Sequence, residues 1–368
     1  MLIGVVKEDD PRVALVPEVI KILEDEKNEV CIENNAGDSV FFHDIHYQQV
    51  KARVDKRENV LKDSDVIVSL KPLPEKDLKL LKKDAILVSM LEPYGVNSTI
   101  TGTLAKYPIT SFSLDMIPRI TLAQSMDVLS SMASIAGYKA VIEAAKYLPR
   151  YFPMLTTAAG TIPPAKVLIL GAGVAGLQAV ATAKRLGAVV EVFDTRTAVK
   201  EEVNSLGAKF IEVEGSTDDK AAGGYAVEQT EEYKKKQSHL IQERAHIADV
   251  IITTAQLRGK PAPTLISKEV VNEMKEGSVI VDLASSTGGN CELSQDNKVV
   301  VEYGVTIIGN SELHSSAPIH ASQLYSKNVH NFLAVLIKEG ELNLDMENEI
   351  LKSSCVTLKG EEMYKPNS

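Results

Sequence analysis

The residues best suited to chemistry form a glycine-rich turn between a predicted strand and a predicted helix. The apolar run 166–170 is followed by the sequence GAGVAG and then by the apolar helical run 177–186. In a GxGxxG turn the first glycine permits a tight bend, the second lets backbone approach a pyrophosphate, and the third lets the helix pack on the sheet. The positive end of the helix would face the phosphates. The turn therefore predicts a dinucleotide site made of Gly171, Ala172, Gly173, Val174 and Gly176.

An acidic residue at the end of the next predicted strand indicates which dinucleotide this turn would hold. Asp194 directly follows the apolar run 189–193, at about twenty residues past the middle glycine. A carboxylate at that place accepts hydrogen bonds from the adenosine ribose and repels a 2′-phosphate. The expected cofactor is NAD(H) rather than NADP(H), with Thr195 and Arg196 in the same site. The positive charge of Arg196 is the one nearby feature that argues against this choice.

Two series of alternating strands and helices surround the turn. In the first third of the chain we expect strands at 2–6, 30–33, 66–70, 86–91 and 109–114, with helices such as 17–27 and 75–82 between them. In the second series we expect strands at 167–170, 189–193, 210–213, 250–253, 279–283 and 305–308. This alternation is typical of βαβ units around parallel sheets. The first series carries no glycine-rich phosphate loop.

Long helices are expected at 124–148, which is rich in small residues, and at 320–337. We therefore predict an α/β fold with two Rossmann-like domains, joined by these two helices around a nucleotide-binding cleft. The first domain is expected to comprise residues 1–128 and 314–368. The NAD(H)-binding domain is expected to comprise residues 129–313.

Composition excludes several other classes of protein. The net charge is −10 and the basic residues are not clustered, which argues against a nucleic-acid partner. No apolar stretch approaches the roughly 20 residues of a membrane-spanning helix, and the N-terminus lacks the features of a signal peptide. No HExxH motif occurs, and the cysteines lack metal-type spacing, so no metal is expected. These cysteines are Cys31, Cys291 and Cys355.

Several segments beyond the glycine turn resemble one family closely. They are PRI-x-x-AQSMD at 118–127, with its continuation to Tyr138, TAAGTIPP at 157–164, KRLGA at 184–188, GKPAP at 259–263 and GGNC at 288–291. Together they resemble the NAD(H)-binding domain I of proton-translocating transhydrogenases over nearly the whole chain. The segment 118–127 is the most specific, since the related alanine dehydrogenases share the fold and the glycine loop but not that run.

The resemblance implies a function in hydride transfer. In that family, NADH bound to domain I passes hydride directly to NADP⁺ bound on a separate domain, and a membrane domain couples this step to proton movement. The implied partners are therefore an NADP(H)-binding domain and a membrane proton-channel domain, and a homodimer is also expected. The chain itself would be soluble, on the cytoplasmic or matrix side of the membrane, and held there through its partners.

The same resemblance implies roles for particular polar residues. Arg119, Gln124, Asp127 and Ser130 would surround the nicotinamide and its ribose. A carboxylate such as Asp127 suits the positive charge of the oxidised ring, and the Gln124 amide can both donate and accept to hold the reduced ring. The alternative interpretation is that these are polar residues at a helix start, where Asp127 favours the N-terminal end.

Further cofactor contacts are expected from two loops and one helix. Gly224 and Tyr225 would lie in a loop that closes over bound nucleotide, with the tyrosine near the adenosine. Thr254, Ala255 and Gln256 follow a predicted strand and would line the crevice where open α/β sheets bind ligands. Tyr138, at the end of the continuation of segment 118–127, is also expected at the cofactor.

Two alternative functions stay open. Arg12 and Lys71 match residues that bind substrate in the alanine dehydrogenases, but Glu92-Pro93 stands where their proton-transferring histidine should follow a strand, and Ser286 replaces their acidic residue. We interpret Arg12 and Lys71 as structural ion pairs rather than catalytic residues. A non-enzymatic NAD sensor is the other alternative. Hydride exchange with an NADP-binding partner would exclude the sensor, and alanine-dependent reduction of NAD⁺ would favour the dehydrogenase.

Overall fold

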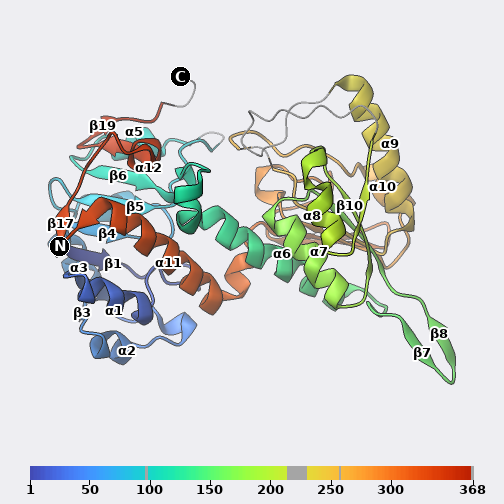
Figure 1. Cartoon of the computed structure of the whole chain (residues 1–368), viewed down its shortest axis with the longest axis horizontal. Coiled ribbons are helices and arrows are strands. Elements are labelled where there is room, and N and C mark those ends of the chain that lie inside the picture. Colours follow the sequence, from blue (N-terminus) through green and yellow to red (C-terminus); the bar gives the residue numbers. More distant parts are fainter. Residues whose placement is uncertain (96–97, 214–229, 257, 366–368) are drawn as a thin grey trace. The chain divides into compact units, whose positions relative to one another are not determined.

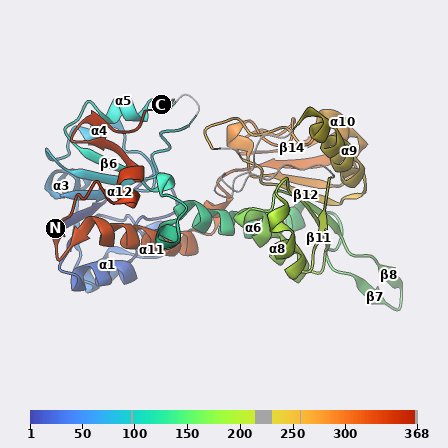
Figure 2. The ribbon, with the colours of Figure 1, turned by 45° about the horizontal axis from the view of Figure 1, so that its top comes forward.

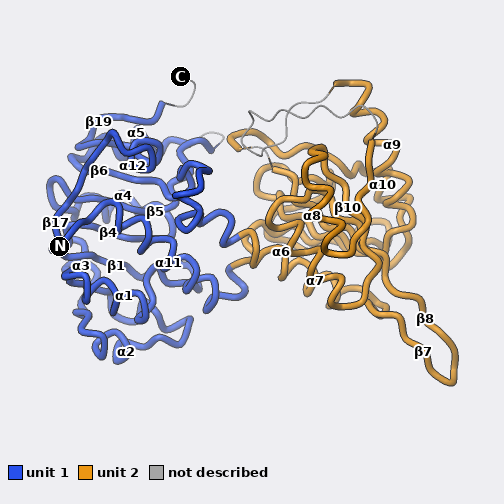
Figure 3. The backbone as a smooth tube through the Cα atoms, viewed as in Figure 1, with its two compact units in different colours: residues 1–132, 315–368 blue, residues 133–314 orange. Residues whose placement is uncertain are grey.

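The chain divides into two units, each built around its own sheet, in a computed structural model (Figure 1). The structure describes residues 1–95, 98–213, 230–256 and 258–365. Unit 1 comprises Met1–Met132 with Ser315–Ser368, and unit 2 comprises Ala133–His314 (Figure 3). Most neighbouring strands in each large sheet run parallel. The predicted α/β class, with two Rossmann-like parallel sheets, is therefore confirmed.

The sheet of unit 1 has the spatial order β19-β18-β6-β5-β4-β1-β2-β3. Its strands are β1 (Leu2–Val5), β2 (Glu29–Glu33), β3 (Arg53–Asp55), β4 (Val66–Val68), β5 (Ile86–Ser89), β6 (Thr110–Ser113), β18 (Cys355–Leu358) and β19 (Glu361–Glu362). The first six are parallel and follow the 3-2-1-4-5-6 order of a doubly wound fold. β18 and β19 extend the sheet antiparallel beyond β6. All five strands predicted here are present, whereas β3, β18 and β19 were not predicted.

The helices of unit 1 pack on this sheet. They are α1 (Pro17–Asp25), α2 (Asp44–Gln49), α3 (Arg57–Asp63), α4 (Glu75–Leu78), α5 (Ile100–Leu104), α11 (Pro318–Leu336) and α12 (Glu349–Ser354). α11 contacts the sheet through Phe332, which packs edge-on against Phe112 of β6 with ring centroids 5.5 Å apart. Ser322 and Ser326 of the same helix accept the backbone N–H groups of Val13 and Val16. A late helix in the sequence thus holds the loop that follows the first strand.

The sheet of unit 2 has the order β11-β10-β9-β12-β13-β15-β14. Its strands are β9 (Lys166–Leu170), β10 (Val189–Phe193), β11 (Lys209–Ile211), β12 (Val250–Thr253), β13 (Val279–Asp282), β14 (Lys298–Glu302) and β15 (Val305–Gly309). Without the antiparallel β14, the strands again follow the 3-2-1-4-5-6 order. The order reverses between β9 and β12, and this switch point is where such sheets bind ligands.

Alternate side chains of β9 enter the two cores of unit 2. Val167 and Ile169 pack in one apolar cluster with α6, α7 and α8, whereas Leu168 and Leu170 pack in the other cluster with α9 and α10. This is the period of two that an extended strand imposes. The helices are α6 (Val128–Tyr147), α7 (Val174–Arg185), α8 (Lys200–Ser205), α9 (Glu231–Ile247) and α10 (Lys268–Glu273). Both faces of the sheet are therefore covered, which explains its continuously apolar strands.

A hairpin that the sequence did not predict extends from unit 2. Its strands are β7 (Leu155–Thr157) and β8 (Gly160–Ile162), and it projects away from the sheet in two views (Figure 2). Most of its residues are exposed, including Ile162.

Among the described residues, no helix combines the length and apolar character needed to cross a membrane.

The start of the first long helix differs from the prediction. Residues Thr121–Met126 form a 3-10 helix, η3, and α6 begins at Val128, so the expected start at residue 124 is wrong. The reason is local. Asp127 has a non-helical backbone, with φ of −74° and ψ of 89°, and separates the two helices.

Candidate functional site

The glycine turn joins β9 to α7 with the geometry that its sequence predicts. Gly171 has a φ of +106°, a left-handed conformation that favours glycine. A Cβ at Gly176 would lie 1.9 Å from the carbonyl oxygen of Gly171, so any side chain there would push α7 off the turn. By contrast, apart from chain neighbours, no described atom lies within 4 Å of a Cβ placed at Gly173. The backbone of the turn is thus open at the one glycine expected to face a ligand.

A second helix supports this turn through another glycine. A Cβ at Gly137 of α6 would lie 2.0 Å from the carbonyl oxygen of Ala175, so the backbones of α6 and the first turn of α7 are in direct contact. The small residues of the predicted long helix therefore serve close packing against the turn. Tyr138, the next residue, is 46% exposed.

The carboxylate of Asp194 lies against the same turn. Its Oδ2 accepts the backbone N–H of Ala172 at 2.7 Å. Arg196 supplies three more donors: its backbone N–H at 2.8 Å and Nε at 2.9 Å bond Oδ1, and Nη2 at 2.8 Å bonds Oδ2. The structure therefore brings Asp194, Ala172 and Arg196 together, with Thr195 between the two charged residues. Arg196 acts as the ion partner of Asp194.

The loop after β12 lies beside the glycine turn. The backbone N–H of Thr254 donates to the carbonyl of Leu170 at 2.9 Å, and its Oγ1 lies 3.3 Å from the carbonyl oxygen of Gly171. A Cβ at Gly171 would come within 2.4 Å of that Oγ1. Gln256 donates through Nε2 to the carbonyl of Leu283 at 3.3 Å. Thr254 therefore lies beside the glycine turn, and Gln256 lies near the end of β13.

Two buried polar residues that were not predicted as site residues hold this loop. The Asn290 amide accepts the N–H of Ala255 at 3.0 Å and donates to its carbonyl at 2.8 Å, as a paired strand would. Asp282, at the end of β13, accepts from Thr253 Oγ1 and from the N–H of Cys291. Both side chains are fully buried. The signal in the sequence was a carboxylate at the end of an apolar strand and an asparagine after two glycines, but neither pattern reveals its partners.

The residues expected around the nicotinamide belong to unit 1. Asp127 accepts the backbone N–H of Ser130 at 2.9 Å and its hydroxyl at 2.6 Å, which makes it the N-cap of α6. The structure thus brings these two residues together. Gln124 and Arg119 are exposed. Asn328 and Asn331 of α11 both donate to the carbonyl of Ser125, which fixes η3 to that helix.

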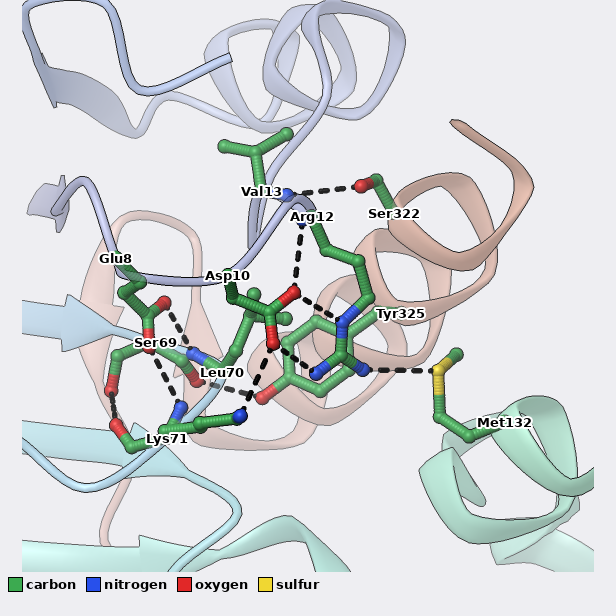
Figure 4. A network of polar contacts seen from close by, with 10 residues as sticks. All are labelled: Glu8, Asp10, Arg12, Val13, Ser69, Leu70, Lys71, Met132, Ser322 and Tyr325. Atoms are coloured by element: carbon green, nitrogen blue, oxygen red, sulfur yellow. Dashed lines mark hydrogen bonds and ion pairs between the residues drawn. The ribbon is translucent and has the colours of Figure 1, made fainter. Parts of the chain in front are cut away.

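The remaining predicted residues divide into two groups. Gly224 and Tyr225 lie outside the described residues. Arg12 and Lys71 lie in a polar network in unit 1, where both are paired with the buried carboxylate of Asp10 (Figure 4). Arg12 bonds that carboxylate through Nε and Nη2, each at 2.8 Å, and Lys71 Nζ lies 3.4 Å from Oδ2. The ion pairs expected for these two residues are therefore present.

A second carboxylate in this network behaves differently. Glu8 accepts the backbone N–H groups of Leu70 and Lys71, at 2.7 and 2.8 Å. Burial raises the pKa of Glu8 to about 7, although these two hydrogen bonds act in the opposite direction. Burial would also raise the pKa of Asp10, but the hydrogen bonds and charge of Arg12 hold it below its ordinary value. The network thus contains one firmly ionised carboxylate and one that titrates near neutrality.

A metal centre is not formed by the described part of the chain, where no group of three His, Cys, Asp or Glu side chains has suitable geometry.

Comparison with known proteins relates both units to one family. The model "Alanine dehydrogenase/PNT, N-terminal domain" matches residues 4–136, and "Alanine dehydrogenase/PNT, C-terminal domain" matches residues 140–365. The chain is 43% identical to the first part of the NAD(P) transhydrogenase alpha subunit of Rhodospirillum rubrum, covering 98% of this chain and 97% of that one. The solved structure of a transhydrogenase from Sinorhizobium meliloti matches with a TM-score of 0.90 and 40% identity, covering 98% of this chain and 100% of that one. An L-alanine dehydrogenase structure shares the fold, with a TM-score of 0.78 and 24% identity over 98% of this chain and 96% of that one. The chain therefore belongs to the alanine dehydrogenase/PNT family, and its sequence and structure are more similar to these transhydrogenases than to that alanine dehydrogenase.

Proposed function

We propose that this chain is the NAD(H)-binding component of a proton-translocating transhydrogenase. In this proposal hydride passes directly between NAD(H) held by this chain and NADP(H) held by a separate domain, and a membrane domain couples the transfer to proton movement. The observation that carries the proposal is the Asp194 carboxylate, bonded to the N–H of Ala172 inside an open GxGxxG turn. The names of the transhydrogenase relatives support the reaction.

The residues of unit 2 fit a dinucleotide. The first N–H groups of a helix have no partner within it and favour an anion, and here the Gly173 backbone leaves room for a pyrophosphate at the start of α7. Asp194 would define the adenosine end and exclude a 2′-phosphate. Thr254, Ala255 and Gln256 would line the same crevice, with Ala255 held by Asn290. Tyr138, Thr195, Arg196, Gly224 and Tyr225 complete the proposed set.

The residues near the start of α6 would orient the reacting ring. When bound, the nicotinamide supplies the hydride, so the protein contributes position and electrostatics. Gln124 is exposed and not part of a regular α-helix, which leaves its amide available to hold the ring. Asp127 would place negative charge near the oxidised ring while its carboxylate caps α6. Arg119 and Ser130 would complete this group.

The chemistry of the alanine dehydrogenases is less well supported. Arg12 and Lys71, the residues that would bind an amino-acid substrate, are both directed to the Asp10 carboxylate. Glu92 follows the fifth strand, where a histidine would be needed to transfer a proton. A non-enzymatic NAD sensor would share the nucleotide site but not the reaction.

We further propose that the chain forms a homodimer and lies at the membrane through its partners. The hairpin β7–β8 and its approach carry exposed apolar side chains, namely Tyr151, Met154 and Ile162. Exposed apolar groups of this kind favour a protein contact. Sedimentation over a range of concentrations tests the dimer, and a monomer at every concentration would contradict it.

A mixing assay tests the proposed reaction. The chain is combined with the NADP-binding domain of a transhydrogenase, and reduction of NADP⁺ by NADH is measured with each component omitted in turn. Transfer that needs both proteins supports the proposal. Absence of transfer with NADH still bound favours the sensor, and reduction of NAD⁺ by alanine would favour the dehydrogenase.

A further inference from the structure

The carboxylate of Asp194 is held by protein donors on both of its oxygens. It accepts one hydrogen bond from Ala172 and three from Arg196, so most of these donors to the carboxylate belong to the arginine. The Asp194 side chain is 6% exposed, whereas that of Arg196 is 24% exposed. The Arg196 side chain is thus partly accessible, and it lies directly against the carboxylate that would contact the ribose.

The geometry of this pair is the one in which an arginine recognises an oxyanion. Nε and Nη2 of Arg196 bond the two separate oxygens of Asp194, in the two-pronged arrangement that also fits a phosphate. The backbone N–H of Arg196 bonds Oδ1 as well, so the residue is anchored to the carboxylate from two directions. A phosphate on the adenosine ribose would compete for the donors that Asp194 now occupies.

We propose that Arg196 is a specificity-determining residue that Asp194 keeps from binding a 2′-phosphate. This inference rests on the proposed NAD(H) site. With Asp194 present, its charge repels NADP(H) and its oxygens occupy the Arg196 guanidinium. With the carboxylate removed, Arg196 becomes the ligand of a 2′-phosphate, and the site accepts NADP(H) without any added positive charge.

Substitution of Asp194 in the whole chain tests this directly. Asp194→Ser removes the carboxylate, and Asp194→Asn keeps the side-chain size and one acceptor for Ala172. Titrations use NADH, NADPH, ADP and 2′,5′-ADP, the last two probing the adenosine end alone. We expect either variant to bind NADPH and 2′,5′-ADP roughly tenfold more tightly than wild type, and Asp194→Ser to bind NADH roughly tenfold more weakly.

The double variant assigns the gain to Arg196. In Asp194→Ser/Arg196→Ala the affinity for NADPH and 2′,5′-ADP should return to within about threefold of wild type, because no guanidinium remains to bind the phosphate. The gained affinity of the single variants should also fall with rising salt, as expected for an exposed ionic contact. Equal NADPH affinity in Asp194→Ser and in the double variant would overturn the proposal. So would the absence of any gain in NADPH affinity in both Asp194→Ser and Asp194→Asn.

A matched control separates this role from a general loss of stability. Asp249 is also largely buried, accepts a backbone N–H from Lys166 and pairs with Arg150 at 2.9 Å and with Lys275 at 3.1 Å. It precedes β12, so it lies at the amino ends of the strands, away from the glycine turn. Asp249→Asn should leave the ratio of NADH to NADPH affinity unchanged. A wild-type chain that binds neither NADH nor ADP would contradict the proposed function itself. Binding of NADH by wild type without any gain in the Asp194 variants would contradict this inference alone.

Discussion

The two units share a strand order but treat the end of their first strand in opposite ways. Both sheets follow the 3-2-1-4-5-6 order, so each has a switch point beside its first strand. In unit 2 a short glycine turn leads directly into α7 and leaves the start of that helix open. In unit 1 a longer charged loop runs from Lys7 to Val16, and its own carboxylates occupy the donors near the switch point.

The backbone after the fourth strand is bonded within the chain in both units, by Asn290 in unit 2 and by the loop after the first strand in unit 1. Glu8 bonds the N–H groups of Leu70 and Lys71, which follow β4, the strand that corresponds to β12 in the other sheet. Asp10 occupies Arg12 and Lys71. The strand order provides a switch point in both units, but the loop after the first strand differs: it carries bonded carboxylates in unit 1 and an open glycine turn in unit 2. This explains why a shared fold did not by itself identify the ligand site.

The largest expected effect comes from removing the ion pair between Arg12 and Asp10 in unit 1. Arg12→Met leaves the Asp10 carboxylate buried with one partner fewer, and should lower the free energy of unfolding by about 3–5 kcal/mol. Urea unfolding followed by probes within unit 1 measures this. NADH affinity of the folded protein should not change. The double variant Arg12→Met/Asp10→Asn should recover part of the loss, and a strong loss of NADH affinity in folded Arg12→Met would contradict the comparison.

The second prediction concerns the pH dependence of Glu8. Its pKa is raised to about 7 in the folded chain from an ordinary value of 4.5. The protonated form is therefore favoured by folding. Its contribution is fully present below pH 4.5 and is lost as the pH rises through 7. We expect the stability of wild type relative to Glu8→Gln to fall by up to about 3 kcal/mol over this window. The free energy of unfolding of both proteins is measured at several pH values from about 4.5 to 8. A constant difference between them would show that Glu8 does not titrate in this range.

The third prediction contrasts two glycines of the open turn. Gly176→Ala places a Cβ 1.9 Å from a carbonyl oxygen, and should destabilise unit 2 by about 1–3 kcal/mol. Gly173→Ala places its Cβ in open space, so the fold should remain intact while NADH affinity drops by roughly tenfold. Thermal unfolding and NADH titration of both variants measure these effects. Equal behaviour of the two variants would remove the distinction between a packing glycine and a ligand-facing glycine.

The smallest effect on stability and on NADH binding is expected at Gln124, where only the rate of hydride transfer should change. Gln124→Asn shortens the amide and should slow NADH-to-NADP⁺ transfer by roughly tenfold or more, because small displacements of a reacting ring are costly. NADH affinity should stay within about threefold of wild type. Single-turnover kinetics with the NADP-binding domain and a separate titration measure both. An unchanged rate would make Gln124 a surface residue of η3, and equal losses would make it an ordinary binding contact.

The sequence predicted the parallel strands well because their residues are apolar on both faces, and it predicted the glycine turn because each glycine has a steric cause. It did not predict β14, whose Val299 and Val301 are exposed on an edge strand. It also placed the start of α6 too early, because the helical spacing of 121–126 is shared by a 3-10 helix.

The buried polar residues that hold the loop after β12 could not be predicted for a different reason. Asn290 and Asp282 act through partners that only the tertiary structure brings near, and their burial follows from the loops that fold over them. The spacing after the glycine turn located Asp194. In the sequence, the positive charge of Arg196 argued against the choice of NAD(H). The structure instead pairs these two residues, a choice that depends on side-chain direction rather than on spacing.

The discontinuous make-up of unit 1 has a consequence for synthesis of the protein. Strand β6 pairs with β18, and the loop after β1 is held by serines of α11, so both contacts await residues beyond position 315. Unit 2, in contrast, is one continuous segment and can complete its sheet before those residues leave the ribosome. Until then the edge of β6 is an unpaired strand, which is prone to aggregation. The nascent chain should therefore depend on chaperones most strongly until residues 315–358 have been made.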